Sequence, residues 1–192
     1  MAMVIIRCEL PSDIAVRELL LDDAFGERRA ARTSERLREG RLPADGLSFT
    51  ATDEDRVVGT VRMWDISAGP GRSALLLGPL AVEAGHRDHG IGGRLISHAV
   101  DQARSHGYSA VLLVGDAPYY GRFGFSAGKT GALWLPGPYE RHRLLGQELT
   151  PGALDGARGL VSATGRLRPL PDLPTMIARL AAEDLGAPSR AA

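Results

Sequence analysis

The chain has 192 residues, enough for one domain or for one domain with an appendage, and its 44% hydrophobic content is typical of a soluble globular protein. Its 23 basic and 23 acidic side chains balance, which argues against a general nucleic-acid binder, because such proteins are strongly basic. The single cysteine, Cys8, excludes an internal disulfide and fits a reducing cytoplasm, and no run approaches the ~20 apolar residues of a membrane helix. We therefore expect a cytoplasmic protein that acts on neither nucleic acid nor membrane.

The chain starts with a predicted strand and a predicted helix. Residues 3–9 are apolar and β-branched, which favours a strand, and Cys8 within it is interpreted as a buried structural thiol. Pro11, Ser12 and Asp13 are typical of a helix start, with Ser12 or Asp13 as the cap. The apolar face expected for this helix consists of Ile14, Leu19, Leu20 and Ala24.

Residues 27–41 are highly charged and predict a second, mostly solvated helix. Its arginines are interpreted as a solvated face, with attraction of an acidic substrate as the alternative; they are Arg28, Arg29, Arg32, Arg36 and Arg38. Residues 47–52 and 56–66 then predict two strands of a hairpin, because Asp53, Glu54 and Asp55 form a turn signal between them.

The middle of the chain alternates strands and helices. Residues 74–82 predict a buried strand, which should bulge or splay at Gly78-Pro79 because proline cannot donate to a sheet. Apolar residues at helical spacing predict a helix over 91–106, and residues 110–114 predict another buried strand. Asp116, Ala117 and Pro118 then open a short helix.

The last third of the chain carries weaker signals. Residues 134–138 indicate a loop, and residues 143–149 a strand. We place the main domain at residues 1–165 and a C-terminal extension at 166–192, with an amphipathic helix over 176–185 and a frayed end.

The glycine-rich turn at residues 85–93 fits three phosphate-binding patterns to different degrees. A P-loop would need Lys and Ser or Thr where Ile91 and Gly92 stand. A dinucleotide fingerprint would need a third glycine at Leu95. The pattern R-x-x-G-x-G is met in full, from Arg87 to Gly92. A helix that begins here presents unpaired N–H groups to an anion, and glycines let that anion approach.

This turn resembles the pyrophosphate-binding turn of the GNAT superfamily of N-acetyltransferases. The segment YYGRFGF at residues 119–125 resembles the other signature of that family, and the combination LGPLAV…RDHGIG…YYGRFGF most resembles its YhbS-like branch. The resemblance implies an α/β fold of the GNAT type, in which helices flank a mixed, mostly antiparallel central sheet splayed between its fourth and fifth strands. It also implies acetyl-CoA as co-substrate, lying in that splay, and no metal.

The resemblance assigns site residues by position. The backbone of Leu80, Ala81 and Val82 would bond the pantetheine amides. The turn that would hold the diphosphate comprises Arg87, Asp88, His89, Gly90, Ile91, Gly92, Gly93 and Arg94. Tyr120 would give a proton to the departing thiolate, whereas Tyr119, Phe123 and Phe125 are interpreted as core aromatics. An asparagine that many members carry before the catalytic tyrosine is missing from the chain.

The general base stays open between Glu83, Asp116 and water, and N-capping of the short helix is the favoured role of Asp116. His86 and His89 could suggest a metal site, but no further ligand stands at a typical spacing.

The implied reaction is direct acetyl transfer from acetyl-CoA to a primary amine, on a small molecule or a protein. The alternative is a non-catalytic acyl-CoA-binding sensor or interaction module. By analogy with the family, the acceptor pocket lies between residues 27–41 and 134–149, and two copies would form a homodimer.

Overall fold

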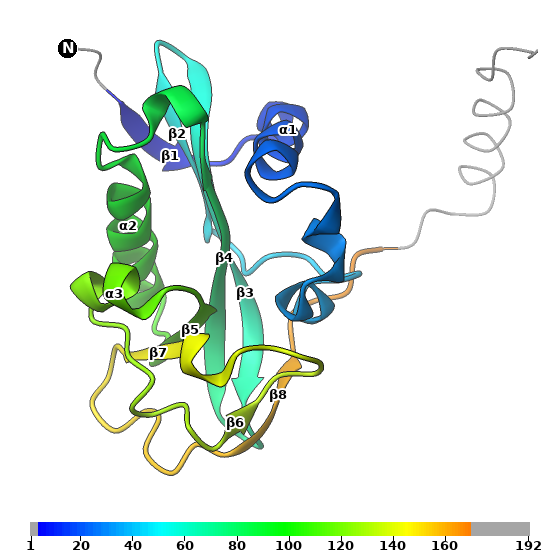
Figure 1. The fold of residues 1–192 in the computed structure, drawn as a ribbon, viewed down its shortest axis with the longest axis vertical. Helices are drawn as coiled ribbons and strands as arrows, with labels where there is room; N and C mark the ends of the chain where they lie inside the picture. The colour runs from blue at the N-terminus through cyan, green and yellow to red at the C-terminus, as the bar shows by residue number, and fades with distance from the viewer. Residues whose placement is uncertain (1–3, 170–192) are drawn as a thin grey trace, which may run out of the picture.

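The computed structural model describes residues 4–169, which form a mixed eight-stranded sheet between helices (Figure 1). The strand order is β1-β2-β3-β4-β5-β7, with β8 beside β3 and β6 beside β8. Neighbouring strands are antiparallel except in the pairs β4–β5 and β6–β8. The strands are β1 (Ile5–Cys8), β2 (Ser48–Asp53), β3 (Arg56–Ala68), β4 (Ser73–Val82), β5 (Ala110–Val114), β6 (Leu133–Trp134), β7 (Leu144–Glu148) and β8 (Gly159–Ala163).

Helices cover both faces of the sheet. Figure 1 shows α2 (Ile91–Ser105) and α3 (Ala117–Tyr120) on one face, and α1 (Ile14–Phe25) on the other. Leu95 and Ile96 of α2 are fully buried against β2, β3 and β4, whereas α1 packs on β3 and β4. Within residues 4–169, no helix is long and apolar enough to cross a bilayer. The mixed sheet flanked by helices confirms the predicted fold class.

The hairpin, the long buried strand and the helix after it form as the sequence predicts. Glu54 and Asp55 take positive φ angles, 47° and 66°, in the turn between β2 and β3. Gly107, at φ 81°, follows the end of α2. The register of β3 and β4 shifts between Val61 and Met63, next to Gly78-Pro79. An irregularity at this proline is therefore confirmed.

Strands β4 and β5 separate soon after they meet. They pair only at Leu75 with Val111 and at Leu76 with Leu112, whereas β4 continues to Val82 along β3 alone. The indole Nε1 of Trp64 donates to the carbonyl of Gly78 at 2.6 Å, which fixes β4 where it turns away. The splay predicted between the fourth and fifth strands is confirmed, and it leaves one edge of β4 without a partner strand.

Four predictions about local structure are wrong. Residues 27–41 form two 3₁₀ helices, Glu27–Ala31 and Thr33–Leu37, because the chain is extended at Arg32. In α1, Leu19 is 70% exposed while Arg17 is buried. Cys8 is exposed, since it ends an edge strand. Part of the loop expected at 134–138 is β6, which pairs with β8, a strand that the sequence did not reveal. The helix predicted over 176–185 lies outside the described residues.

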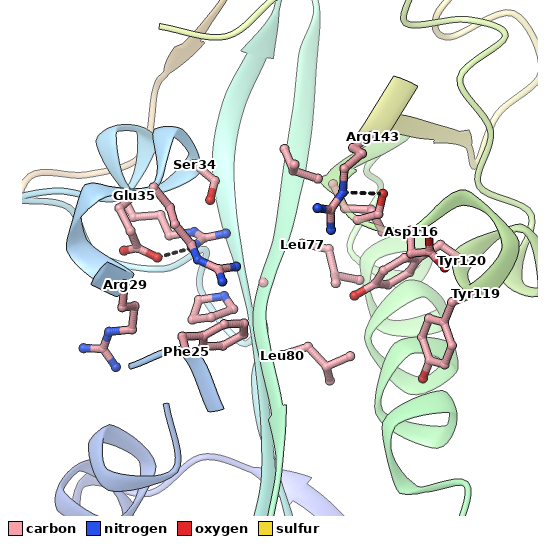
Figure 2. Close-up of a pocket in the computed structure, with 17 residues that line it drawn as sticks. Phe25, Arg29, Ser34, Glu35, Leu77, Leu80, Asp116, Tyr119, Tyr120 and Arg143 are labelled. Carbon is pink, nitrogen blue, oxygen red and sulfur yellow. Dashed lines mark hydrogen bonds and ion pairs between the residues drawn. The ribbon is translucent and has the colours of Figure 1, made fainter. Parts of the chain in front are cut away.

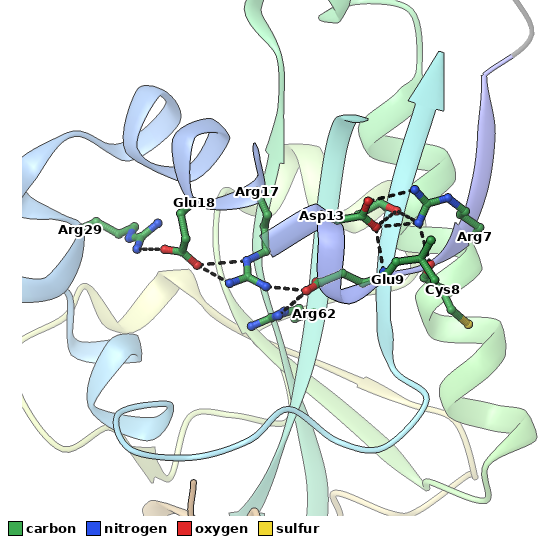
Figure 3. A network of polar contacts seen from close by, with 10 residues as sticks. Arg7, Cys8, Glu9, Asp13, Arg17, Glu18, Arg29 and Arg62 are labelled. Carbon is green, nitrogen blue, oxygen red and sulfur yellow. Dashed lines mark hydrogen bonds and ion pairs between the residues drawn. The ribbon is translucent and has the colours of Figure 1, made fainter. Parts of the chain in front are cut away.

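A chain of ion pairs explains why an arginine of α1 points inward (Figure 3). The Glu9 carboxylate accepts hydrogen bonds from Arg17 Nη1 at 2.5 Å and from Arg62 Nε at 2.8 Å. Arg17 also donates to Glu18, whose other oxygen is 2.5 Å from Arg29 Nη2. These contacts join β1, β3 and α1 to the 3₁₀ segment after α1. They hold that segment over the sheet.

Asp13 fixes the start of α1 but does not cap it directly. Its carboxylate accepts from Arg7 at 2.6 and 3.0 Å and from the backbone N–H of Leu10 at 2.8 Å, so it caps the 3₁₀ turn Pro11–Asp13 before the helix. The hydrogen bond from Arg7 holds the pKa of this carboxyl below its ordinary value of 3.8, and the Leu10 N–H adds to the shift. Ionised Asp13 therefore stabilises the fold.

We predict that Asp13→Asn lowers the free energy of unfolding by about 1–3 kcal/mol at neutral pH, because it weakens hydrogen bonds to a charged acceptor. The folded pKa lies below the unfolded value of 3.8, so this contribution is complete above 3.8 and disappears as the pH falls through the folded pKa. Urea unfolding at several pH values should show wild type and variant converging in acid. Asp101→Asn, on an exposed pair of α2, should change stability by under about 0.5 kcal/mol. If the free energies of unfolding of wild type and Asp13→Asn differ as much in acid as at neutral pH, this account is wrong.

Candidate active site

The turn before α2 exposes the amino end of the helix. Gly90, at φ 73°, takes the left-handed conformation at the N-cap position, and Asp88 takes a positive φ of 65°. Within residues 4–169 no side chain caps the helix, which leaves its first N–H groups available to a ligand. Together with the positive end of the helix dipole they favour an anion here.

Glycine is required in this turn for two different structural reasons. A Cβ on Gly90 would meet no atom within 4 Å, so the reason for glycine there is the positive φ. A Cβ on Gly92 would lie 3.1 Å from the Tyr119 hydroxyl, and one on Gly93 would lie 3.1 Å from the Phe123 ring. Gly92 and Gly93 therefore let the aromatic residues after β5 pack closely on the first turn of α2.

A groove of about 590 Å³ lies between this turn, the open edge of β4 and the aromatic residues of and after α3. Of the residues that the sequence singled out, the structure brings to this groove Leu80, Val82, Arg87, Asp88, Gly90, Ile91, Gly92 and Gly93. Arg122 stacks over the Tyr119 ring at 4.6 Å and extends the wall. Tyr119 and Phe123 line the groove and so are not simply core residues, whereas Phe125 is buried as predicted.

Three of the predicted residues do not line the groove. Arg94 donates to the carbonyl of Val4 at 2.8 Å, and His89 is exposed beside the turn. Ala81 is buried, and it pairs with Thr60 of β3. His86 lines the groove, and its Nε2 lies 3.2 Å from Oδ2 of Asp53.

The open edge of β4 presents backbone groups at alternate residues. Glu83 donates its N–H to the carbonyl of Val58, so the backbone groups of Glu83 and Ala81 face β3. Those of Leu80 and Val82 therefore face the groove. Arg87 Nε donates to the Val82 carbonyl at 3.3 Å, which anchors the turn to the strand.

A second cavity, of about 230 Å³, opens on the other side of the splay. Figure 2 shows Phe25, Arg29, Ser34 and Glu35 on one wall, with the tyrosines and Arg143 opposite. Leu80 and Tyr119 line both the groove and this cavity. The two spaces are therefore adjacent at Leu80 and Tyr119.

Tyr120 projects into this second cavity. Its hydroxyl points toward Leu77 and Leu80 in Figure 2. Its ring packs edge-on against Tyr119 at 5.0 Å and Phe125 at 6.2 Å between centroids. A Cβ at Gly115 would overlap this ring, so the glycine that follows β5 makes room for it.

The phenol of Tyr120 stays protonated over a wide pH range. Burial raises its pKa to about 12, Tyr119 adds to the shift, and the positive charge of Arg143 opposes it. The group is therefore neutral near pH 7. It can donate a proton or a hydrogen bond, but it is a poor base.

The candidate bases lie in different places. Asp116 is exposed on the rim of the cavity, and its carboxylate makes no capping bond to α3, so the predicted capping role is wrong. Glu83 pairs with Arg56, and in the described part of the chain it lines neither the groove nor the cavity. Glu35, which the sequence did not single out, also lines the cavity and pairs with Arg38.

The cavity takes residues from two segments far apart in the chain. Arg29, Arg32 and Arg38 come from the 3₁₀ region, and Arg143 comes from the residue before β7. The interpretation of residues 27–41 as a solvated face is wrong for Arg38, whose side chain is 7% exposed. Leu37 and Thr33, which stand between charged residues in the sequence, are both buried. Their presence was the available signal that one side of this segment packs against the protein. No sequence pattern indicated that Gly115 and Arg143 would line the cavity.

Comparison with known proteins links this geometry to one group. The profile of the Acetyltransferase (GNAT) family matches residues 14–125. The uncharacterized N-acetyltransferase YhbS of Escherichia coli (strain K12) is 31% identical over 158 residues, which is 82% of this chain and 94% of YhbS. A second N-acetyltransferase of that strain, YjhQ, is 34% identical over 128 residues, or 62% of this chain and 69% of YjhQ.

Two solved structures share the fold. The E. coli YhbS crystal structure in complex with CoA superposes with a TM-score of 0.73 and 30% identity, over 85% of this chain and 91% of that one. A GNAT family acetyltransferase from Brucella melitensis, in complex with acetyl-CoA, superposes with a TM-score of 0.63 and 25% sequence identity. The match covers 85% of this chain and 97% of that one. The resemblance to the YhbS-like branch is therefore confirmed.

We predict that Tyr120 does not ionise below pH 10, the ordinary pKa of tyrosine, because its phenolate would be buried. Tyrosinate absorbance of wild type and of Tyr120→Phe, followed from neutral pH to pH 10, should give superimposable titrations. Circular dichroism at each pH should verify that both proteins stay folded. A wild-type excess of one tyrosinate with a midpoint at or below pH 10 would contradict the prediction.

Proposed function

Because the chain belongs to the GNAT family of acetyltransferases, we propose that it transfers the acetyl group of acetyl-CoA directly to a primary amine in a ternary complex. The observation that carries this proposal is the junction at Leu80 and Tyr119. There a groove suited to a phosphorylated, extended ligand adjoins a separate cavity. Two substrates can therefore reach one point from opposite sides.

The groove residues suit acetyl-CoA as a co-substrate. The uncapped N-terminus of α2 and the side chain of Arg87 would bind the diphosphate. The outward-facing backbone groups of Leu80 and Val82 would bond the amides of pantetheine in the manner of an added strand. Arg122, stacked on Tyr119, offers a planar cation at the outer end. No step of this binding requires a metal.

Acetyl-CoA supplies an acetyl group bonded to a good thiol leaving group. The protein must remove one proton from the amine and donate one proton to the sulfur. The amine nitrogen forms a bond to the acetyl carbon, the carbon–sulfur bond breaks, the amine loses a proton and the sulfur gains one. Tyr120, protonated at neutral pH, donates to the sulfur. The charge of Arg143 stabilises the tyrosinate that remains. We assign removal of the amine proton to Asp116, directly or through water, because Asp116 lines the cavity and Glu83 does not.

A non-catalytic acyl-CoA sensor is the alternative. The buried tyrosine and the second cavity favour the enzyme, since a sensor needs only the groove. The cytoplasmic location and the homodimer stay predictions.

We predict that Gly92→Val weakens acetyl-CoA binding about tenfold or more, because the added side chain would occupy the groove beside Val82 and Tyr119. Isothermal titration calorimetry with acetyl-CoA measures this. Gly85→Val is the matched control, since Gly85 has a negative φ, open space around it and no place in the groove. Equal affinity of the two variants would count against the groove as the cofactor site.

We predict that acetyl-CoA with a panel of primary amines releases free thiol, and that Tyr120→Phe lowers kcat about a hundredfold with little change in acetyl-CoA affinity. Gly115→Ala keeps the phenol but displaces its ring, so kcat should fall there too. Thiol release and mass spectrometry of the product measure both.

Tyr139→Phe, which removes a phenol hydrogen-bonded to the carbonyl of Leu133, is the control for loss of a hydroxyl near the site. Its kcat should stay within a few fold of wild type. If kcat of Tyr120→Phe equals that of wild type at every pH, Tyr120 is not the acid. If no amine in the panel causes thiol release, the proposed function is wrong.

A further inference from the structure

The cavity that Tyr120 faces has a basic lining. Four arginines line it: Arg29, Arg32, Arg38 and Arg143. Among the residues that the structure describes, two acidic side chains do so, Glu35 and Asp116. Arg29 is already paired with Glu18 and Asp22 outside the cavity. The other three arginines have unused hydrogen-bonding capacity.

Arg38 is a buried guanidinium with an unused donor. Its side chain is 7% exposed and makes one ion pair, with Glu35. Its Nε has no hydrogen-bond partner among residues 4–169. Its Nη2 lies 3.2 Å from where a Cβ of Gly78 would stand, so the group reaches the bend of β4 at the cavity. A buried charged donor left unbonded costs free energy, and an anionic ligand would remove that cost.

Arg32 and Arg143 line both this cavity and an adjacent one of about 340 Å³. Arg32 lies over the Phe25 ring at 4.7 Å, and no carboxylate lies within 4.0 Å of it in the described part of the chain. The nearest carboxylate oxygen to Arg143, on Glu140, is 3.9 Å away. Two guanidinium groups without close counter-ions among the described residues therefore lie where the two cavities adjoin.

Building on the proposed acetyl transfer, we propose that the acceptor is a small amine that carries a carboxylate. Arg32, Arg38 and Arg143 bind the carboxylate while the amine faces Leu80 and Tyr120. Planar guanidinium groups match the two oxygens of a carboxylate. A small molecule fits better than a protein lysine, because Arg38 is reached only inside the cavity and a lysine side chain carries no anion there. Phosphate shares this chemistry, and the experiment separates the two.

The test compares amines that differ only in the anionic group. Thiol release from acetyl-CoA is measured with ω-amino carboxylic acids, with alkylamines of matched length, and with aminoalkylphosphonates. The amines have similar basicity, so a difference reports recognition of the anion. We expect kcat/KM to be about tenfold or more higher for the carboxylates than for both other series.

Variants identify the groups responsible. Arg32→Gln removes an exposed charge, so the fold should be kept, and the ratio of kcat/KM between carboxylate and alkylamine should fall about tenfold. Arg104→Gln is the control, since Arg104 is an exposed arginine of α2 outside the cavity, and its ratio should equal that of wild type.

The outcomes separate this inference from the proposed function. Equal kcat/KM for carboxylate and alkylamine would leave acetyl transfer intact and overturn the carboxylate acceptor, as would a preference for the phosphonate. No thiol release from any amine would overturn the proposed function. The anion site is then judged by binding: glutarate should raise the Tm of the CoA-saturated wild type more than that of Arg32→Gln. No such difference would overturn the anion site as well.

Discussion

The separation of β4 from β5 after Leu76 is the constraint on which the rest of the site depends. A parallel pair that stayed together would use both edges of β4 for the sheet, and neither the groove nor the cavity would exist. Pro79 has no N–H to offer a neighbouring strand, and the register of β3 shifts opposite this bend. The separation leaves the outward-facing backbone groups of Leu80 and Val82 without a partner strand; Arg87 bonds the Val82 carbonyl, and solvent or a ligand can bond the others.

Two sets of contacts hold the walls on either side of that opening. On one side, Gly92 and Gly93 allow Tyr119 and Phe123 to pack closely on α2, so the turn that favours an anion is in contact with these aromatic side chains. On the other side, the ion pairs from Glu9 through Arg17 and Glu18 to Arg29 tie the irregular 3₁₀ segment to the sheet. The Glu9–Arg17 pair is buried on both sides, whereas the Glu18–Arg29 pair that reaches the 3₁₀ segment is partly exposed and screened by solvent.

The sequence predicts those parts of the fold that rest on local patterns. The strong periodicity of α2, the left-handed Gly107 after it and the proline in β4 are local, and each is found where expected. The prediction of a mostly solvated helix over residues 27–41 failed because Leu37 and Arg38 are buried by contacts with distant segments. The high local content of charged residues does not reveal such contacts. Strand β8 was missed for the same reason, since it exists only through pairing with β3 and β6. The groove could therefore be predicted in large part, whereas the basic cavity could not.

The chemistry of the cavity follows from placing a buried phenol near a cation. Burial alone would keep Tyr120 protonated so firmly that it could hardly release its proton, since each unit of pKa shift corresponds to about 1.4 kcal/mol. Arg143 partly offsets that burial, and it lines the cavity in which an anionic acceptor would lie. A bound carboxylate would neutralise part of the Arg143 charge and so raise the pKa of Tyr120, which makes the phenol a weaker acid while the acceptor is bound. The same arginine would thus link acceptor binding to the acid strength of Tyr120.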